Sequence, residues 1–418
     1  MYRKTSAGRF ANTMSQSHHH PVNTDSYYIP DAIWDRGRNV LGAMFLLGWG
    51  AALAGYAQNH DQFFQSYLVA FFFAFSIAIG ATLFTMIQHL TGSAWSVPVR
   101  RIMENIMMSL PVLGLLFIPV ALGLHSLYEW SHPEFVAKEV MELKKGVYTN
   151  FLNPKMFYIR AVAYFLIWSF WAWKLYSNSK SQDTTKALGP TFANEKWSAP
   201  GMLLFFLSGS LASFDWVMSL NPHWYSTMFG VYCLAGGAWG FFALLTFIFL
   251  RFRANGIMVN SVTTEHYHDL GKWMFALTVF WAYIAFSQYM LIWYANMPEE
   301  TIFFKMRRTG SWEAMSGVLL FGHFIFTFLL LLARNSKRTL NVLRFATLWI
   351  LAMHYTDVYW LVMPNFHKAG IAFSWIDLAT LAAVMSTAGL AFWMRLRKAP
   401  IAPIGDPRFK KGLEFQNV

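Results

Sequence analysis

An apolar run that begins at Gly201 continues into Leu211-Ala-Ser-Phe-Asp-Trp-Val-Met-Ser-Leu-Asn-Pro-His-Trp-Tyr225. The run is long enough to cross a membrane, and it places the carboxylate of Asp215 inside the predicted span. A carboxylate at that depth costs roughly 2.5–3.5 kcal/mol on insertion scales, so its presence indicates a function. A second stretch of this kind, 351–364, contains Asp357. We interpret the remainder of the chain as the frame that holds these two acidic helices in lipid.

The composition excludes a soluble globular protein. Of the 418 residues, 56% are hydrophobic and only 13% are charged, whereas soluble domains have roughly 45–50% and 25%. The net charge of +12 arises from basic residues in short loops between apolar runs. It therefore indicates membrane topology and not nucleic-acid binding. The single cysteine, Cys233, excludes an internal disulfide and a thiolate-held cluster, so such redox centres would belong to partner subunits.

Ten apolar runs follow a polar N-terminal tail, and each is close to the ~20 residues that cross a membrane. We therefore predict an all-α polytopic membrane protein with ten transmembrane helices, arranged as two four-helix bundles plus two peripheral helices. The predicted spans are 39–56, 67–89, 105–127, 157–176, 201–220, 226–249, 272–294, 315–332, 341–362 and 371–394.

These spans divide the chain into six parts. The parts are an N-terminal tail (1–38), a first helix with its loop (39–66), a first four-helix bundle (67–225), a second four-helix bundle (226–366), the tenth helix (367–396) and a C-terminal tail (397–418). Spans five and nine share a Leu-Ala start, an Asp and a later Pro near the same face. This similarity suggests that the two bundles are a parallel repeat.

The distribution of Lys and Arg predicts the orientation. The two tails and the loops on their side carry 21 of these residues, and the loops on the other side carry 8. Because positive residues collect in cytoplasmic loops, we expect both termini in the cytoplasm of a bacterial inner-membrane protein. Two loops are longer than simple turns. Mixed charge predicts an exposed helix in 132–155, outside, and polar residues predict a surface connection in 178–200, inside.

Seven protonatable residues form a candidate proton relay. Carboxylates and imidazoles that are buried in lipid can change charge near neutral pH, as a relay requires. The alternative is that each group only locks neighbouring helices through hydrogen bonds. The candidates are an outer group of Asp215, His354, Asp357 and Asp377, a central His323, and an inner pair of His89 and Glu104.

A quinone site needs an aromatic-lined cleft with a His or Asp that exchanges protons with the ring oxygens. The outer ends of spans three to five supply His125, Arg160, Asp215 and Trp216 as candidates. Aromatic residues at helical spacing are more often core or lipid-facing residues than parts of such a site. Haem ligation by histidine pairs is a weaker alternative, because no two pairs at matching depth stand out. No metal site is predicted.

Three motifs carry a resemblance to a known family. They are Thr91-Gly-Ser-Ala-Trp-Ser-Val-Pro-Val-Arg-Arg-Ile-Met-Glu104, Ser213-Phe-Asp-Trp-Val-Met-Ser-Leu-Asn-Pro-His-Trp-Tyr-Ser-Thr-Met-Phe-Gly230 and His354-Tyr-Thr-Asp357. With ten spans and both termini inside, the chain resembles the polysulfide-reductase-type (NrfD-like) membrane subunits. It is most similar to the smaller of the two such subunits in bacterial alternative complex III.

The resemblance implies a membrane subunit of a respiratory quinol:cytochrome c oxidoreductase complex, with no redox cofactor of its own. It implies menaquinone or ubiquinone as the quinone. The partners it implies are a sister NrfD-like subunit, periplasmic iron–sulfur and haem c subunits, lipid, and a terminal oxidase as a further candidate. In the family, the quinol site of the sister subunit uses a His and an Asp in the first bundle.

Span four of this chain carries Arg160 and no Asp. The departure favours a proton-conducting or structural role beside the sister subunit, and not quinol oxidation by this chain alone. Asp215, His323, His354 and Asp357 are then the expected relay.

Two other classes stay open. A stand-alone proton-coupled transporter would also need intramembrane acids, but it would usually have helices broken near the midplane. Only span three, with Pro111 and Pro119, is interrupted by proline. A purely structural scaffold would have buried acids that no reaction requires.

Overall fold

The computed structural model describes residues 25–138, 146–148 and 150–417. Within these ranges the chain forms helices and no strand, which confirms the all-α prediction. Nine of the described helical segments are long and apolar enough to cross a membrane, so the chain is a multi-pass membrane protein. The ninth predicted span is not among these nine segments, and it corresponds to α17 (Leu340–Val362). This helix is about 34 Å long at 1.5 Å per residue, and Arg344, His354 and Asp357 dilute its apolar character.

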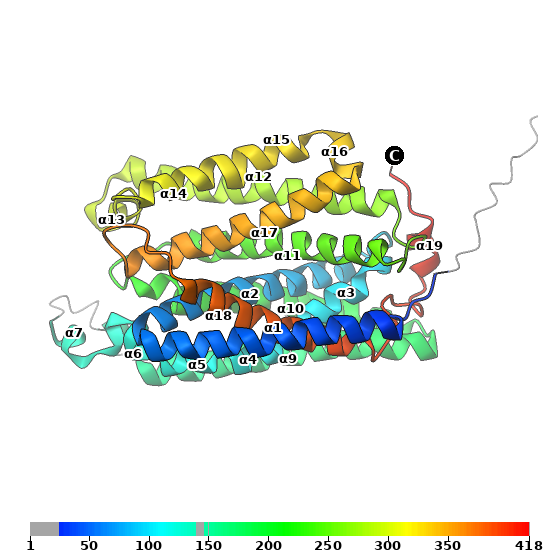
Figure 1. Cartoon of the computed structure of the whole chain (residues 1–418), viewed down its shortest axis with the longest axis horizontal. Coiled ribbons are helices and arrows are strands. Elements are labelled where there is room, and N and C mark those ends of the chain that lie inside the picture. Colours follow the sequence, from blue (N-terminus) through cyan, green and yellow to red (C-terminus); the bar gives the residue numbers. More distant parts are fainter. Residues whose placement is uncertain (1–24, 139–145, 149, 418) are drawn as a thin grey trace, which may run out of the picture.

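The other long helices run side by side along the long axis of the molecule (Figure 1). They are α1 (Asp31–Gln58), α2 (His60–Leu90), α9 (Pro154–Thr185), α10 (Gly189–Trp216), α11 (Met228–Ala254), α12 (Thr264–Ala295) and α18 (Trp375–Leu396). Two further spans are built from shorter pieces. They are α3 (Val97–Met107) with α4 (Leu110–Leu116) and α5 (Ile118–Leu122), and α14 (Trp312–Val318) with η3 (Leu319–Phe326) and α15 (Thr327–Leu332).

The remaining elements are short and lie in the connections. They are α6 (Leu124–Leu127), η1 (Glu129–Ser131), α7 (Pro133–Lys138), η2 (Met218–Leu220), α13 (Pro298–Met306), α16 (Arg334–Arg338), η4 (Met363–Asn365) and α19 (Phe409–Leu413). We refer to α2 through α10 as the first helix group and to α11 through α17 as the second helix group.

In each of the two segmented spans, a local feature of the sequence or backbone explains why the α-helix is interrupted. In the third span, Pro111 and Pro119 fall in the first turns of α4 and α5, because proline lacks the N–H that a helix interior requires. In the eighth span, η3 is a π-helix. The carbonyl of Gly322 there accepts hydrogen bonds from Thr327 Oγ1 and Trp349 Nε1, both at 3.0 Å. These bonds satisfy a carbonyl at the wider turn.

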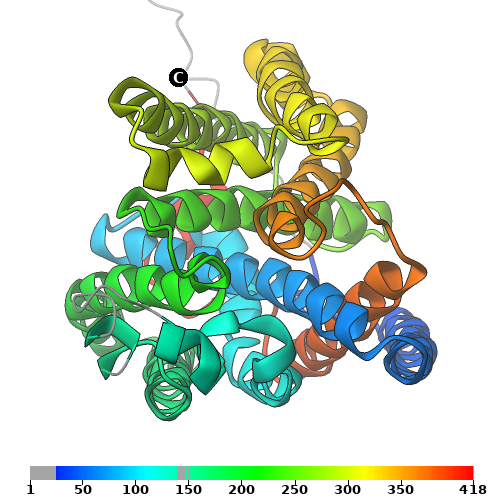
Figure 2. The same ribbon diagram turned by 90° about the vertical axis from the view of Figure 1, so that its left-hand side faces the viewer.

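Helix α2 lies at the centre of the molecule (Figure 2). Its apolar segment is buried along its whole length, and it packs against α3, α10, α11, α17 and α18. A side chain at Gly80 would come within 2.7 Å of the carbonyl of Gly237 on α11, so the close crossing requires a small residue there. Leu46 and Leu47 of α1 are 71% and 74% exposed, as expected of a helix that faces lipid.

Both described ends of the chain lie at the same end of the helix bundle. The Ile401 N–H donates to the Tyr27 carbonyl at 2.8 Å, and Arg397 pairs with Asp31 at 2.8 Å. We call this the terminal end, and the end that carries α13 the opposite end (Figure 1). An even number of crossings places two chain ends together in this way.

The sequence predicted a surface connection over 178–200, and this prediction is wrong about the length of the connection. Helix α9 continues to Thr185 and α10 begins at Gly189, so most of this segment is helical. Asn178 donates to Asn194 at 2.9 Å, and Gln182 donates to Thr191 at 2.7 Å. Polar side chains therefore join the two helix extensions beyond their apolar parts.

The outer connection 132–155 is described only in part. Helix α7 begins it, in agreement with the predicted helix, while 139–145 and 149 lie outside the described residues. Helix α1 begins at Asp31, inside the predicted polar tail. Most of that tail, 1–24, also lies outside the described residues.

Candidate functional site

The predicted site residues occupy five separate places. Asp357, His354 and His323 meet in the second helix group. Asp215 and Arg160 meet in the first, where Trp216 follows Asp215 on α10. Asp377 lies between α2 and α18 at the opposite end. His89 and Glu104 lie at the terminal end, and His125 lies apart from all of them on α6.

The carboxylate of Asp357 is the centre of the first place. It is 2% exposed, and α17 holds it between α11 and α12. The hydroxyl of Tyr232 on α11 donates to Oδ1, and the indole N–H of Trp281 on α12 donates to Oδ2 at 3.2 Å. Two neutral donors from two helices therefore surround a buried acid, without a salt bridge among the described residues. Such an acid can gain or lose a proton without breaking an ion pair.

His354 lies one turn before Asp357 on α17. Its Nε2 hydrogen-bonds Ser76 Oγ on α2 at 2.8 Å, and its Nδ1 has no partner within the described part of the chain. A Cβ placed on Gly236 of α11 would lie 3.4 Å from His354 Nδ1 and 3.5 Å from Asp357 Oδ2. The free nitrogen and the carboxylate therefore face the same space, which the glycine leaves open.

His323 completes this group from the π-helix. Its ring lies between the indoles of Trp239 and Trp281, with centroids 3.9 and 3.6 Å away. Neither ring nitrogen has a hydrogen-bond partner among the described residues, although the side chain is fully buried. Buried polar atoms without partners are rare and point to a role beyond packing. Since Trp281 also donates to Asp357, one indole touches both predicted relay residues.

Asp215 has different surroundings. Arg160 on α9 donates to both of its oxygens, at 2.7 and 2.8 Å, and Tyr164 donates at 2.9 Å. This is a two-pronged charge-assisted pair, which is strong and specific in geometry. Arg160 also binds the carbonyl of Phe151 at 2.8 Å. The structure therefore brings Arg160 and Asp215 together, in an arrangement that locks α9 to α10.

Trp216 and His125 do not line a common cleft with the Asp215–Arg160 pair. The indole of Trp216 is fully buried and stacks on Phe165, with Phe117 on another side. His125 is exposed and hydrogen-bonds Ser131 at 3.0 Å. The space next to Asp215 that the sequence suggested for a quinone is occupied by packed aromatic rings.

Asp377 acts as a helix cap. Its Oδ2 accepts from the Ser374 N–H at 2.8 Å in a capping box at the start of α18, and Ser66 Oγ donates to its Oδ1 at 2.6 Å. Gln62 Nε2 in turn donates to Ser66 at 3.0 Å. Capping and a bond to α2 account for both carboxylate oxygens.

Glu104 belongs to a buried ion-pair network at the terminal end. It accepts from Arg100 Nε at 3.3 Å and from Arg101 Nε at 3.0 Å. Arg101 also pairs with Asp183 at 2.8 Å, and Arg100 with Asp406 at 2.5 Å. The network joins α3 to α9 and to the C-terminal tail, so a structural role accounts for Glu104.

Two partners in that network were not predicted from the sequence, because Asp183 and Asp406 lie far along the chain from Arg100 and Arg101. Burial raises the pKa of Asp406, but the charge of Arg100 and hydrogen bonds from Arg408 and Arg100 outweigh it and hold the pKa at about 2. His89, nearby, has only a long contact of 3.5 Å to Asn194. Its Nδ1 has no partner in the described ranges.

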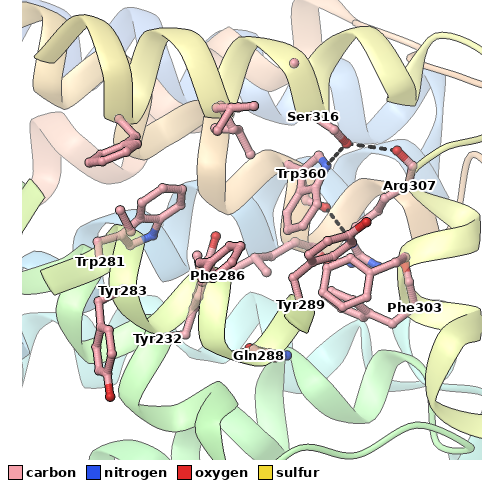
Figure 3. A pocket seen from close by; sticks show the side chains of 18 of the residues that line it. Tyr232, Trp281, Tyr283, Phe286, Gln288, Tyr289, Phe303, Arg307, Ser316 and Trp360 are labelled. Atoms are coloured by element: carbon pink, nitrogen blue, oxygen red, sulfur yellow. Dashed lines mark hydrogen bonds between the residues drawn. The ribbon is translucent and has the colours of Figure 1, made fainter. Parts of the chain in front are cut away.

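A cavity of about 680 Å³ lies in the second helix group, between α12, α13 and the α14–η3 segment (Figure 3). No sequence pattern predicted this cavity. Aromatic side chains form a large part of its wall, and Arg307 lies at its end. One sequence feature could have indicated the cavity. Gly317 is a small residue among large apolar residues, and it lies close to a loop with two arginines.

No protein-family model matches the chain, and no curated protein matches it. Among the described residues, no group of three or more His, Cys, Asp and Glu side chains is placed to hold a metal ion.

Proposed function

We propose that this chain is an integral membrane subunit of a respiratory quinol-oxidising complex and that its second helix group conducts protons. The observation that carries the proposal is the buried group of Asp357, His354 and His323. Asp357 and His323 both contact the Trp281 indole, and Asp357 and His354 both face the space beside Gly236. An acid and two imidazoles that lie this close together are the usual components of a proton relay in a membrane.

The order of transfer follows from the contacts. Asp357 lies within two turns of the end of α17 at the opposite end of the bundle, so it is the entry or exit group on that side. His354 Nδ1 faces the same space beside Gly236 as the Asp357 carboxylate, and a water molecule there would contact both. The other nitrogen of His354 continues the path to Ser76 on the central helix α2. Neutral imidazole carries a donor and an acceptor at once, which suits it to pass a proton on.

Asp215 is better explained as a structural residue than as a relay member. Its two-pronged pair with Arg160 would have to break before Asp215 could exchange a proton with a neighbour, because such a charge-assisted pair is strong and specific in geometry. We therefore assign the relay to Asp357, His354 and His323, and the joining of α9 to α10 to the Asp215–Arg160 pair.

Membership of a respiratory complex rests on the three sequence motifs quoted above. The expected partners are a sister membrane subunit and periplasmic iron–sulfur and haem c subunits, with menaquinone or ubiquinone as reductant and a cytochrome c or oxidase as acceptor. The orientation with both termini in the cytoplasm rests on the Lys and Arg distribution, and it puts Asp357 on the periplasmic side.

The deciding experiment is a mild affinity purification from native membranes, followed by reconstitution into liposomes. We expect c-type haem and iron–sulfur subunits to co-purify and quinol oxidation to release protons. Asp357→Asn should keep the assembly and slow proton translocation beyond the two protons that each oxidised quinol itself releases by about tenfold or more, since general acid–base groups contribute roughly 100- to 10,000-fold to the rate of a proton-transfer step.

The matched control is Asp377→Asn. It is the same substitution at a buried acid of the same end, and the amide oxygen of asparagine can still accept from the Ser374 N–H as the N3 member of the capping box, so coupling should be retained. A chain that purifies alone and colourless would overturn the respiratory assignment and favour a stand-alone transporter. Unchanged proton release in Asp357→Asn within an intact complex would favour a structural scaffold.

A further inference from the structure

The cavity beside α12 opens toward lipid. Its wall includes Tyr283 and Phe286 of α12 and Leu320 of η3, which are 64%, 61% and 53% exposed. All three lie on helical segments apolar enough to cross the membrane. An apolar molecule can therefore enter from the bilayer without crossing water.

The inner end of the cavity is polar and positively charged. The guanidinium of Arg307 is 2% exposed and donates to the carbonyls of Trp360, Phe303 and Leu361 at 3.1, 2.9 and 2.8 Å. No carboxylate forms a salt bridge with it among the described residues. Ser316 Oγ accepts from the Trp360 indole at 2.9 Å and donates to the Arg307 carbonyl at 2.8 Å (Figure 3). A buried arginine held in this way has two further N–H groups to donate.

The wall of the cavity is also hydrogen-bonded to the relay. Tyr232 and Trp281 both line it, and both donate to the Asp357 carboxylate behind them. A polar atom in the cavity that contacts Tyr232 would thus be separated from the buried acid by one side chain.

We propose that this cavity binds the ring of an isoprenoid quinone, with the tail leaving between α12 and η3 into the bilayer. The inference rests on the proposed function and names where in this chain the quinone lies. A cavity of about 680 Å³ is within the usual range for ligand sites, ~300–1,000 Å³. Its aromatic wall suits a flat ring, and Arg307 supplies hydrogen-bond donors for a ring oxygen.

The charge distribution favours a neutral head group over an anionic lipid. The lining contains Arg307, Arg308 and Glu313, and the Asp357 carboxylate lies behind Tyr232 and Trp281, so two basic and two acidic side chains surround the site. A phosphate would add a negative charge to a site that already has two carboxylates, and unpaired buried charge is costly.

The test is photolabelling of the full-length chain in native membranes, with short-chain ubiquinone and menaquinone analogues that carry an azido group. We expect label on peptides that cover 279–289 and 303–320, and competition by the unlabelled quinones. Gly317→Leu fills the cavity where nothing lies within 4 Å of the added Cβ. It should reduce labelling at least about tenfold, equivalent to about 1.4 kcal/mol of binding.

The matched control is Gly42→Leu on α1, where the added Cβ also meets nothing within 4 Å and which does not line this cavity. It should label like the unmodified chain. Labelling that survives Gly317→Leu, or that falls on 125–216 instead, overturns the assignment. Competition by phosphatidylglycerol and not by quinone also overturns it, and identifies an anionic-lipid site.

Failure of this inference is separable from failure of the proposed function. If Asp357→Asn uncouples proton release but no label reaches the cavity, the relay stands and the quinone site falls. If the chain labels as expected but purifies without redox partners, the site stands and the respiratory assignment falls.

Discussion

At the scale of single residues, Asp215 and Asp357 are both lone carboxylates near the same end of an apolar helix, yet their surroundings differ. Asp215 is neutralised by a guanidinium that binds both of its oxygens, whereas Asp357 has an indole and a phenol as donors. Proton exchange at Asp215 must break a charge-assisted pair, whereas proton exchange at Asp357 breaks no ion pair among the described residues. The same residue type therefore joins two helices in one helix group and, under the proposed function, exchanges protons in the other.

The ion pair of Asp215 gives a stability prediction. Arg160→Gln leaves a buried carboxylate unpaired and should destabilise the chain by about 3–5 kcal/mol, because breaking one side of a buried pair is costly. The double variant, Arg160→Gln with Asp215→Asn, should recover part of that loss. Thermal unfolding in detergent measures both. A double variant that is no more stable than the single one would contradict a structural role for this pair.

The sequence predicted which residues are buried and unusual, but not how they pair. Arg160 and Asp215 are 55 residues apart, and both were candidates for a quinone site, since no sequence pattern indicates that one neutralises the other. His354 and Asp357 are three positions apart in the sequence, a spacing that puts both on one face of a helix. The third member, His323, needed the π-helix and the two flanking indoles to be placed.

At the scale of helices, the packing of α11 against α2 and α17 determines the space around the relay. Gly236, Gly237 and Gly240 on α11 allow Ser76 and His354 to approach the helix backbone. Composition and hydropathy predicted ten membrane-crossing segments, because burial in lipid imposes a length and an apolar sequence. The helix ends were less predictable, since α9 and α10 extend past the apolar parts through polar contacts between them.

Gly240 provides the prediction at this scale. A Cβ there would lie 2.6 Å from His354 Cδ2 and 3.2 Å from Ile77. Gly240→Ala should therefore displace the imidazole, destabilise the chain by about 1–3 kcal/mol as over-packing does, and reduce proton release. Gly42→Ala, where the added Cβ meets nothing within 4 Å, is the control and should lose no stability. Equal unfolding temperatures for the two variants would show that the crossing tolerates a side chain.

At the scale of the whole molecule, the C-terminal tail closes the terminal end of the bundle. Ile401 and Ala402 are fully buried, and Gly405 lies against the carbonyl of Gln182. Asp406 then enters the ion-pair network through Arg100. Residues from three distant parts of the chain meet there, which is why the sequence alone indicated only a C-terminal tail (397–418).

The pKa of Asp406 gives a pH prediction. Its folded value of about 2 lies below the ordinary 3.8, so the ionised carboxylate stabilises the docked tail at any pH above about 4. This contribution, on the order of 2 kcal/mol, should be lost as the pH falls from about 4 to 2. Pepsin cleavage of the tail across this range measures the loss. Asp406→Asn should release the tail already at pH 4, and a tail equally protected in both forms would contradict the assignment.

The burial of α2 on all sides has a consequence for biosynthesis. This helix leaves the ribosome well before α11, α17 and α18, which later cover it. Until about residue 254 has been made, the surface of α2 that carries Ser76 and Gly80 faces lipid or an insertion chaperone. The nascent protein therefore passes through a half-built state, and a chain truncated after α10 would expose that surface permanently to the proteases that remove unassembled membrane proteins.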